Sequence, residues 1–178
     1  MPLDPPKPQL EFLFRASLLA GVARSVGRTP LGERRIVEIV GGEVTGPKLT
    51  GTVLPGGADW QIVRDDGTTL LEARYTVQTE DSSLVYVQHT GFRHGPPELT
   101  LRIARGEDID PARYYFRAAP TFETSAPAAF ARPKDCASGW VTDWITTPIL
   151  PRVTLPYLTR SSFTFIATSI GMAKLTPM

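Results

Sequence analysis

The sequence predicts an all-β domain in which antiparallel strands form a closed or nearly closed barrel. Segments that alternate apolar and polar residues recur at short intervals, as half-buried strands do. The 15 glycines and 17 prolines among 178 residues exceed the average combined share of roughly 12% and favour turns between short strands. No long helical pattern separates these segments. We favour a barrel over a sandwich because closure removes exposed sheet edges, and about eight strands leave an interior that can hold one small ligand.

The length and charge of the chain limit its domain number and the partners it can bind. A chain of 178 residues fits one domain over residues 1–178, and a formal charge of +1 lacks the basic field that nucleic-acid binding requires. No apolar run reaches the roughly 18 residues of a membrane-spanning helix. The single cysteine, Cys136, excludes an internal disulfide, and the first ten residues lack the pattern of a secretory signal. We therefore expect a cytoplasmic protein with no nucleic-acid or membrane partner.

The first elements are an arm and two strands. Residues 1–9 contain four prolines and should be extended. The apolar alternation of LEFLFRASLL predicts a strand over residues 10–19, and RRIVEIV predicts another over residues 34–40. Gly41 and Gly42 follow directly, which indicates a bulge or sharp bend.

A hairpin is predicted next, with strands over residues 58–64 and 69–79. The Asp66-Gly67 pair between them accepts the positive φ values of a tight turn. On the second strand the alternation assigns Tyr75 to an apolar face and Arg74 to the opposite, polar face.

Three more strands are predicted, over residues 83–92, 113–118 and 161–172. Residues 126–155 have a different composition, with many Ser, Thr, Ala and Pro residues. There, Trp140 and Trp144 recur at helical spacing. We expect this insert to contain a short helix or irregular segment that covers the mouth of the barrel as a lid.

The sequence gives little support for a metal site or for a catalytic nucleophile. His89 and His94 are the only histidines, no His-Glu-x-x-His spacing occurs, and no serine lies in a Gly-x-Ser-x-Gly elbow. Cys136 lies in the proline-flanked insert and is best interpreted as an incidental thiol. The sequence therefore predicts neither a metal site nor a cofactor.

Asp59 is the first candidate catalytic residue, and two interpretations of it stay open. It could bond to nearby backbone donors while Trp60 fills the core. Alternatively, its carboxyl group lies at the barrel mouth beside an aromatic wall, where desolvation raises its pKa and lets it donate a proton. Tyr75 and His89 both lie on faces that should be buried, where a core role and a ligand contact are both open.

Arg117 and Glu123 are the other two candidate catalytic residues. Arg117 shares a face with Tyr115 and could pair with Glu123 or bind an anionic oxygen. Glu123 follows Phe122 among residues that should be buried, which would keep a carboxylic acid protonated. The candidate substrate contacts are Arg35, Trp60, Tyr75, His89, Tyr115 and Phe122.

Several motifs resemble one family. LPGGADWQ, the ARY triplet and the later FET triplet, in this order, are similar to the bacterial and fungal domain of unknown function 3237, over about residues 10–125. The resemblance implies a calycin-like, lipocalin-like barrel with a central pocket, and some fungal members resemble cyclases or isomerases of aromatic polyketides in secondary metabolism. After Glu123 the chain departs from the family pattern.

We expect a cofactor-independent acid–base enzyme that closes an oxygen ring in a hydrophobic, prenylated aromatic substrate by hydroalkoxylation. Asp59 or Glu123 would protonate the alkene, and Arg117 would hold the phenolic oxygen. The alternatives are a non-catalytic carrier of hydrophobic small molecules and an oligomeric structural protein. A homo-oligomer is compatible with each of these functions.

Overall fold

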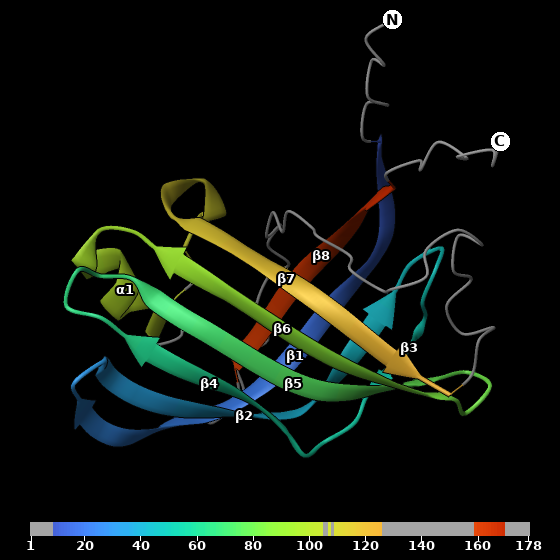
Figure 1. Cartoon of the computed structure of the whole chain (residues 1–178), viewed down its shortest axis with the longest axis horizontal. Coiled ribbons are helices and arrows are strands. Elements are labelled where there is room, and N and C mark those ends of the chain that lie inside the picture. The colour runs from blue at the N-terminus through green and yellow to red at the C-terminus, as the bar shows by residue number, and fades with distance from the viewer. Residues whose placement is uncertain (1–8, 105–106, 108, 126–158, 170–178) are drawn as a thin grey trace, which may run out of the picture.

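The computed structural model describes residues 9–104, 107, 109–125 and 159–169. This part of the chain contains eight antiparallel strands, one α-helix and one 3₁₀ turn (Figure 1). The elements in chain order are β1 (Gln9–Thr29), β2 (Gly32–Thr45), β3 (Gly51–Val53), β4 (Gly57–Val63), β5 (Thr69–Thr79), β6 (Leu84–His94), α1 (Pro97–Ala104), η1 (Pro111–Arg113), β7 (Tyr115–Thr124) and β8 (Thr159–Ser169).

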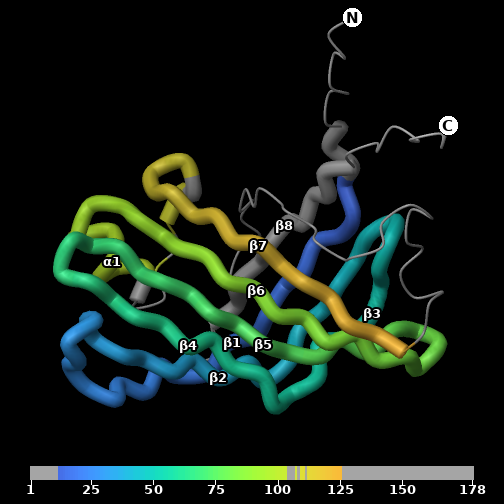
Figure 2. Tube along the Cα trace, viewed as in Figure 1, coloured from blue at the N-terminus to red at the C-terminus, as the bar shows by residue number. Residues whose placement is uncertain are grey.

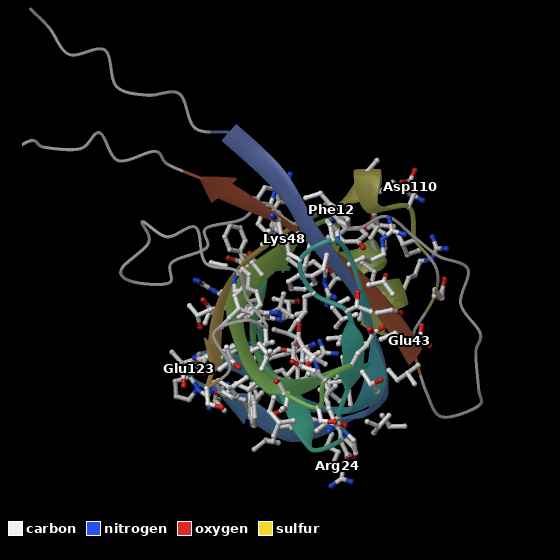
Figure 3. The ribbon with its side chains drawn as sticks, turned by 90° about the vertical axis from the view of Figure 1, so that its right-hand side faces the viewer. Phe12, Arg24, Glu43, Lys48, Asp110 and Glu123 are labelled. Carbon is white, nitrogen blue, oxygen red and sulfur yellow. The ribbon has the colours of Figure 1, made fainter. Side chains whose placement is uncertain are left out.

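The strands form one sheet in the order β7-β6-β5-β3-β2-β1-β8, and β4 pairs with both β2 and β5. Strands β3 and β4 follow one another in the space between β2 and β5, and each pairs with both of these strands. In Figure 2, β5, β6 and β7 form one wall and β1 crosses behind it, and Figure 1 shows β8 alongside β1. The sheet therefore rolls into the predicted barrel, and Figure 3 shows the strands around an interior occupied by side chains.

The predicted bulge occurs in β2. The pairing of β1 with β2 shifts where Leu19 pairs with Gly41 but Ala20 pairs with Ile39, which leaves one extra residue in β2. Gly41 and Gly42 have φ values of +156° and +148°. A Cβ atom on Gly42 would lie 2.2 Å from the Ser17 carbonyl oxygen. Only glycine lets the two strands approach this closely, and the bulge bends the long β1–β2 hairpin.

The predicted hairpin of β4 and β5 is also confirmed. Gly67 has a φ of +81°. Its N–H donates to the Arg64 carbonyl at 3.2 Å, and the Arg64 N–H donates to the Thr68 carbonyl at 2.8 Å. Asp66 accepts a hydrogen bond from the Thr68 N–H at 2.9 Å. The turn chemistry of Asp66-Gly67 therefore sets the register of these two strands.

The helix α1 was missed in the sequence. Pro97 opens it, Glu98 lies in its first turn and Arg102 in its last, an order that favours a helix. Strand β1 also extends ten residues beyond the predicted end at Leu19. The arm over residues 1–8, the insert over 126–155 and the helix at Trp140 and Trp144 lie outside the described residues.

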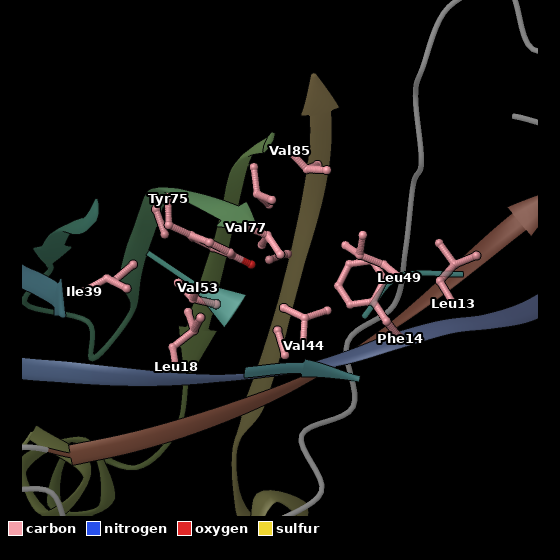
Figure 4. Packing of buried hydrophobic residues seen from close by; sticks show 14 of the residues in the cluster. Leu13, Phe14, Leu18, Ile39, Val44, Leu49, Val53, Tyr75, Val77 and Val85 are labelled. Carbon is pink, nitrogen blue, oxygen red and sulfur yellow. The ribbon is translucent and has the colours of Figure 1, made fainter. Parts of the chain in front are cut away.

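Most of the apolar core lies at one end of the barrel interior (Figure 4), and Leu71 and Phe116 extend it toward the other end. Strand β5 contributes alternating buried residues, and the neighbouring strands face them with valine, leucine, isoleucine and phenylalanine side chains. The members of this apolar half include Phe14, Leu18, Ile39, Val44, Val53, Tyr75, Val77, Val85 and Val87. The other end of the interior is different in character, and it holds the candidate site.

Candidate active site

The register of the strands places a set of polar residues inside the barrel. Ala73 of β5 is buried, and its partners are Asp59 on β4 and His89 on β6. Thr69, two inward-facing positions further along β5, is buried beside Arg93 of β6. We call this end, next to α1, the polar half of the interior; its members are Arg35, Asp59, Gln61, Thr69, His89 and Arg93.

Asp59 is held by two hydrogen bonds inside the polar half. Its Oδ2 accepts from Gln61 Nε2 at 2.7 Å, and its Oδ1 accepts from the Glu72 backbone N–H at 3.2 Å. Burial raises the pKa of the Asp59 carboxyl group, although both hydrogen bonds and the positive charge of Arg93 oppose the shift. Asp59 therefore holds a proton to a higher pH than an exposed aspartate does.

Two arginines share this region with Asp59. Burial lowers the pKa of Arg93; Tyr114 and Asp59 counteract this shift, while the positive charge of Arg35 adds to it. The Arg35 side chain is 16% exposed, and its Nε lies 3.9 Å from Glu33 Oε1. The Nε atoms of both arginines are buried, and neither has a hydrogen-bond partner among the described residues. These guanidinium groups are therefore positioned to bind a further acceptor.

His89 and Tyr75 lie at the border between the two halves. Their rings meet edge to face at 5.9 Å between centroids. Burial lowers the pKa of His89 to about 4, so the imidazole is neutral near pH 7, and burial also raises the pKa of Tyr75. The Tyr75 hydroxyl points toward Val53 and Val77 (Figure 4). Both residues are buried inside the barrel, as their strand faces predicted.

Trp60 does not line the interior with Asp59. Successive side chains in a strand point to opposite faces, so Trp60 lies on the outside of β4. There the Arg74 guanidinium lies 5.3 Å from the centre of the indole ring. The predicted aromatic wall beside Asp59 is therefore absent at this position, and the core role for Trp60 is also wrong.

The outward face of β7 carries three other candidates. Tyr115 is 41% exposed and stacks on Phe92 at 5.2 Å between centroids, with the Arg117 guanidinium 4.9 Å from the Tyr115 ring. Glu123 is exposed and lies on the outside of the ring in Figure 3. Phe122 points inward and packs edge to face on Phe14 at 5.8 Å. The expectation that Glu123 is buried is wrong because the register of β7 turns its even-numbered residues inward.

A family model for a protein of unknown function, DUF3237, matches residues 8–131. This chain is a DUF3237 protein. The match covers the strands β1 to β7, which build the barrel and the polar half, and it confirms the resemblance found in the sequence.

Relatives of this DUF3237 protein come from bacteria and a fungus. A UPF0311 protein of Rhodopseudomonas palustris is 43% identical over 122 residues, or 68% of this chain and 80% of that protein. The hydroalkoxylation enzyme phnH of Penicillium herquei is 35% identical over 83 residues, or 47% of this chain and 55% of the enzyme.

Solved structures share the fold. A protein of unknown function from R. palustris has a TM-score of 0.73 and 32% identity, covering 92% of this chain and 99% of that one. A protein from Acinetobacter baumannii, described as β-barrel like, has a TM-score of 0.64 and 33% identity, covering 91% of this chain and 98% of that one. An enzyme from P. herquei has a TM-score of 0.59 and 25% identity, covering 93% of this chain and 99% of the enzyme.

Three polar residues of the DUF3237 barrel were not predicted from the sequence. Arg93 shares the strand parity of His89, which indicates an inward position, but a charged residue near a strand end was not considered. Gln61 likewise shares the parity of Asp59. Tyr114, just before β7, packs on the core and interacts with Arg93, whereas its neighbour Tyr115 was predicted to contact the substrate.

Two further properties concern other kinds of site. Among the described residues, no group of three or more His, Cys, Asp or Glu side chains is arranged to hold a metal ion. In the same part of the chain, no helix has the length and apolar character needed to cross a membrane.

Proposed function

We propose that this DUF3237 protein closes an oxygen ring by intramolecular hydroalkoxylation, with Asp59 as the general acid. The observation that carries the proposal is a buried carboxyl group with a raised pKa that lies near two arginines inside the barrel. The similarity to the hydroalkoxylation enzyme of P. herquei supports the same reaction class. The substrate class is a hydrophobic phenol that carries an alkene side chain.

The reaction needs one proton, which Asp59 can donate and recover. The protonated carboxyl group would transfer its proton to an alkene carbon, which leaves a tertiary cation and the Asp59 carboxylate. The phenol oxygen then forms a C–O bond to the cation, and its proton returns to Asp59. Gln61 and the Glu72 N–H would stabilise the carboxylate between the two steps because both donate to it.

Arg93 and Arg35 replace Arg117 as the groups that hold the phenol oxygen. Both lie on the inner face with Asp59, whereas Arg117 lies on the outer face of β7. A guanidinium group that hydrogen-bonds the oxygen would favour the phenolate and direct it toward one face of the cation. His89 is neutral near pH 7 and would add no positive charge that repels the cation.

The border between the two halves would take the rest of such a substrate. The polar half would take the phenol, and Tyr75 and the apolar residues next to it would contact the hydrocarbon chain. Holding the chain in one pose explains why a protein is needed, since the uncatalysed closure can occur on either face.

Ring closure of 2-geranylphenol to the chroman tests this proposal, with the rate and the enantiomeric ratio measured by chiral chromatography. We expect Asp59→Asn to lower the rate by about 10²- to 10⁴-fold, the usual contribution of a general acid. Glu123→Gln removes an exposed carboxylate and should leave both values unchanged. Equal rates for wild type and Asp59→Asn would refute the proposal, and stoichiometric binding without conversion would favour a carrier.

A further inference from the structure

The polar half contains more positive than negative charge when Asp59 is protonated. Arg35 and Arg93 both project inward, from β2 and β6. Glu33 lies 3.9 Å from Arg35, but its side chain is 44% exposed and also accepts a hydrogen bond from Ser25. A neutral Asp59 leaves Arg93 with no carboxylate partner among the interior residues named above. A buried guanidinium without a counter-ion is costly, so a ligand that supplies negative charge would be favoured.

The pairing of β2 with β4 places Arg35 beside the Asp59 region, and electrostatic coupling links Arg93 to Asp59. Arg35 pairs with Gln61, which lies two residues from Asp59 on the same face of β4. Arg93 is electrostatically coupled to Asp59, to Tyr114 and to Arg35. Within the described part of the chain, the Nε–H group of each arginine has no hydrogen-bond partner. Two guanidinium groups near one carboxyl group match a ligand with two neighbouring oxygens, such as an ortho-hydroxybenzoate or a 1,3-dicarbonyl enolate.

We propose that the polar half binds its substrate as an oxyanion between Arg35 and Arg93, and that Asp59 takes up a proton as the anion binds. This inference rests on the proposed function only in taking the polar half as the substrate site. It adds that the substrate is negatively charged when it binds and that Asp59 becomes protonated in this step. The anion attracts the proton because it draws the arginine charge away from the carboxylate and adds a like charge near it.

Other charged and titratable groups surround Asp59. Those on the inner face are Arg35 and Glu33 on β2, His89 and Arg93 on β6, and Tyr114 before β7. Glu72 of β5 lies on the outer face, where it pairs with Arg74, and its charge still acts on Asp59. The negative charge of Glu72 raises the pKa of Asp59 and that of Arg93 lowers it. Near pH 8 the pKa of about 4 leaves His89 neutral, so Asp59 is the group whose protonation responds to the anion.

Binding affinity tests the anion site. The probe is 3-geranyl-2-hydroxybenzoate, and its neutral partner is 2-geranylphenol, which has the same chain and phenol but no carboxylate. We expect the benzoate to bind about tenfold to a hundredfold more tightly, the usual value of a charged hydrogen bond. Arg93→Met should abolish this preference, whereas Arg117→Met, on the outer face, should keep it. Equal affinities in the wild type, or an equal loss in both variants, would overturn the anion site.

Calorimetry tests the proton. The heat of binding the benzoate near pH 8, measured in buffers with different ionisation enthalpies, gives the number of protons taken up. We expect a number approaching about one in the wild type and close to zero in Asp59→Asn. Proton uptake near zero in the wild type, or equal uptake in Asp59→Asn, would overturn the proposed protonation of Asp59.

These tests are separate from ring closure. Tight binding of the anion with proton uptake but no chroman would refute the proposed function and leave this inference standing. Chroman formation with equal affinity for both probes would refute this inference and leave the proposed function standing.

Discussion

His89 should make the stability of the protein depend on pH in the mildly acidic range. Its imidazole is buried, and its pKa in the folded protein is about 4, compared with 6.5 when exposed. Between these values the unfolded chain binds a proton that the folded protein does not. The free energy of unfolding therefore falls as the pH decreases from 6.5 toward 4 and reaches its full value above 6.5.

The size of this effect follows from the two pKa values. They differ by about 2.5, and each unit corresponds to 1.36 kcal/mol, so the full contribution is about 3 kcal/mol. By pH 5, about 2 kcal/mol of this should be lost. Asp59 acts in the opposite direction because its pKa is raised by folding, so the folded protein holds the extra proton and loses stability as the pH rises.

Urea unfolding at pH 7.5 and pH 5, followed by circular dichroism, isolates the His89 contribution. The His89→Gln variant should lose about 2 kcal/mol less than the wild type between these pH values, because Asp59 affects both proteins equally. His94→Gln is the matched control, since His94 is exposed and hydrogen-bonds Thr68 Oγ1 at 3.0 Å; it should follow the wild type. An equal loss in wild type and His89→Gln would refute the burial argument.

Two substitutions test the packing of the barrel. Phe14→Ala, at a residue 1% exposed, should lower the free energy of unfolding by about 3–5 kcal/mol. Phe12→Ala, at a residue 43% exposed, should lower it by less than about 1 kcal/mol. Equal losses of the two variants in urea unfolding would contradict the core described above. Gly91→Ala would place its Cβ 2.3 Å from the Arg117 carbonyl oxygen and should cost about 1–3 kcal/mol or more, whereas Gly21→Ala meets nothing closer than 3.5 Å. If Gly91→Ala melts at the temperature of Gly21→Ala, the close approach of β6 and β7 is wrong.

The strands and turns of the barrel could be predicted because their signals are local. The alternation around Tyr75 identified the inner face of β5, and Gly41-Gly42 and Asp66-Gly67 indicated the bulge and the hairpin. Each depends on a period of two or on backbone angles that few residues adopt. The helix α1 was missed because Leu99, Leu101 and Ile103 alternate with polar residues, which is the pattern of a strand.

The candidate site was harder to predict because it depends on register between distant strands. Asp59 and Trp60 are adjacent, yet only Asp59 points inward, and a one-residue change in register would exchange them. The same parity separates Glu123 from Phe122 on β7. The coupling of Arg93 to Asp59 depends on how side chains from β4 and β6 meet inside the barrel, which no local pattern shows.

In the proposed mechanism Asp59 donates the proton that starts ring closure, and the position of deuterium in the product reports on this step. Wild-type protein converting 2-geranylphenol in D₂O should place one deuterium at C3 of the chroman, in one of its two diastereotopic positions, because a fixed acid delivers it to one face. Asp59→Asn should give only the slow uncatalysed product with deuterium in both positions. Deuterium spread equally over both positions in the wild-type product, or the same rate and placement with Asp59→Asn, would contradict this mechanism.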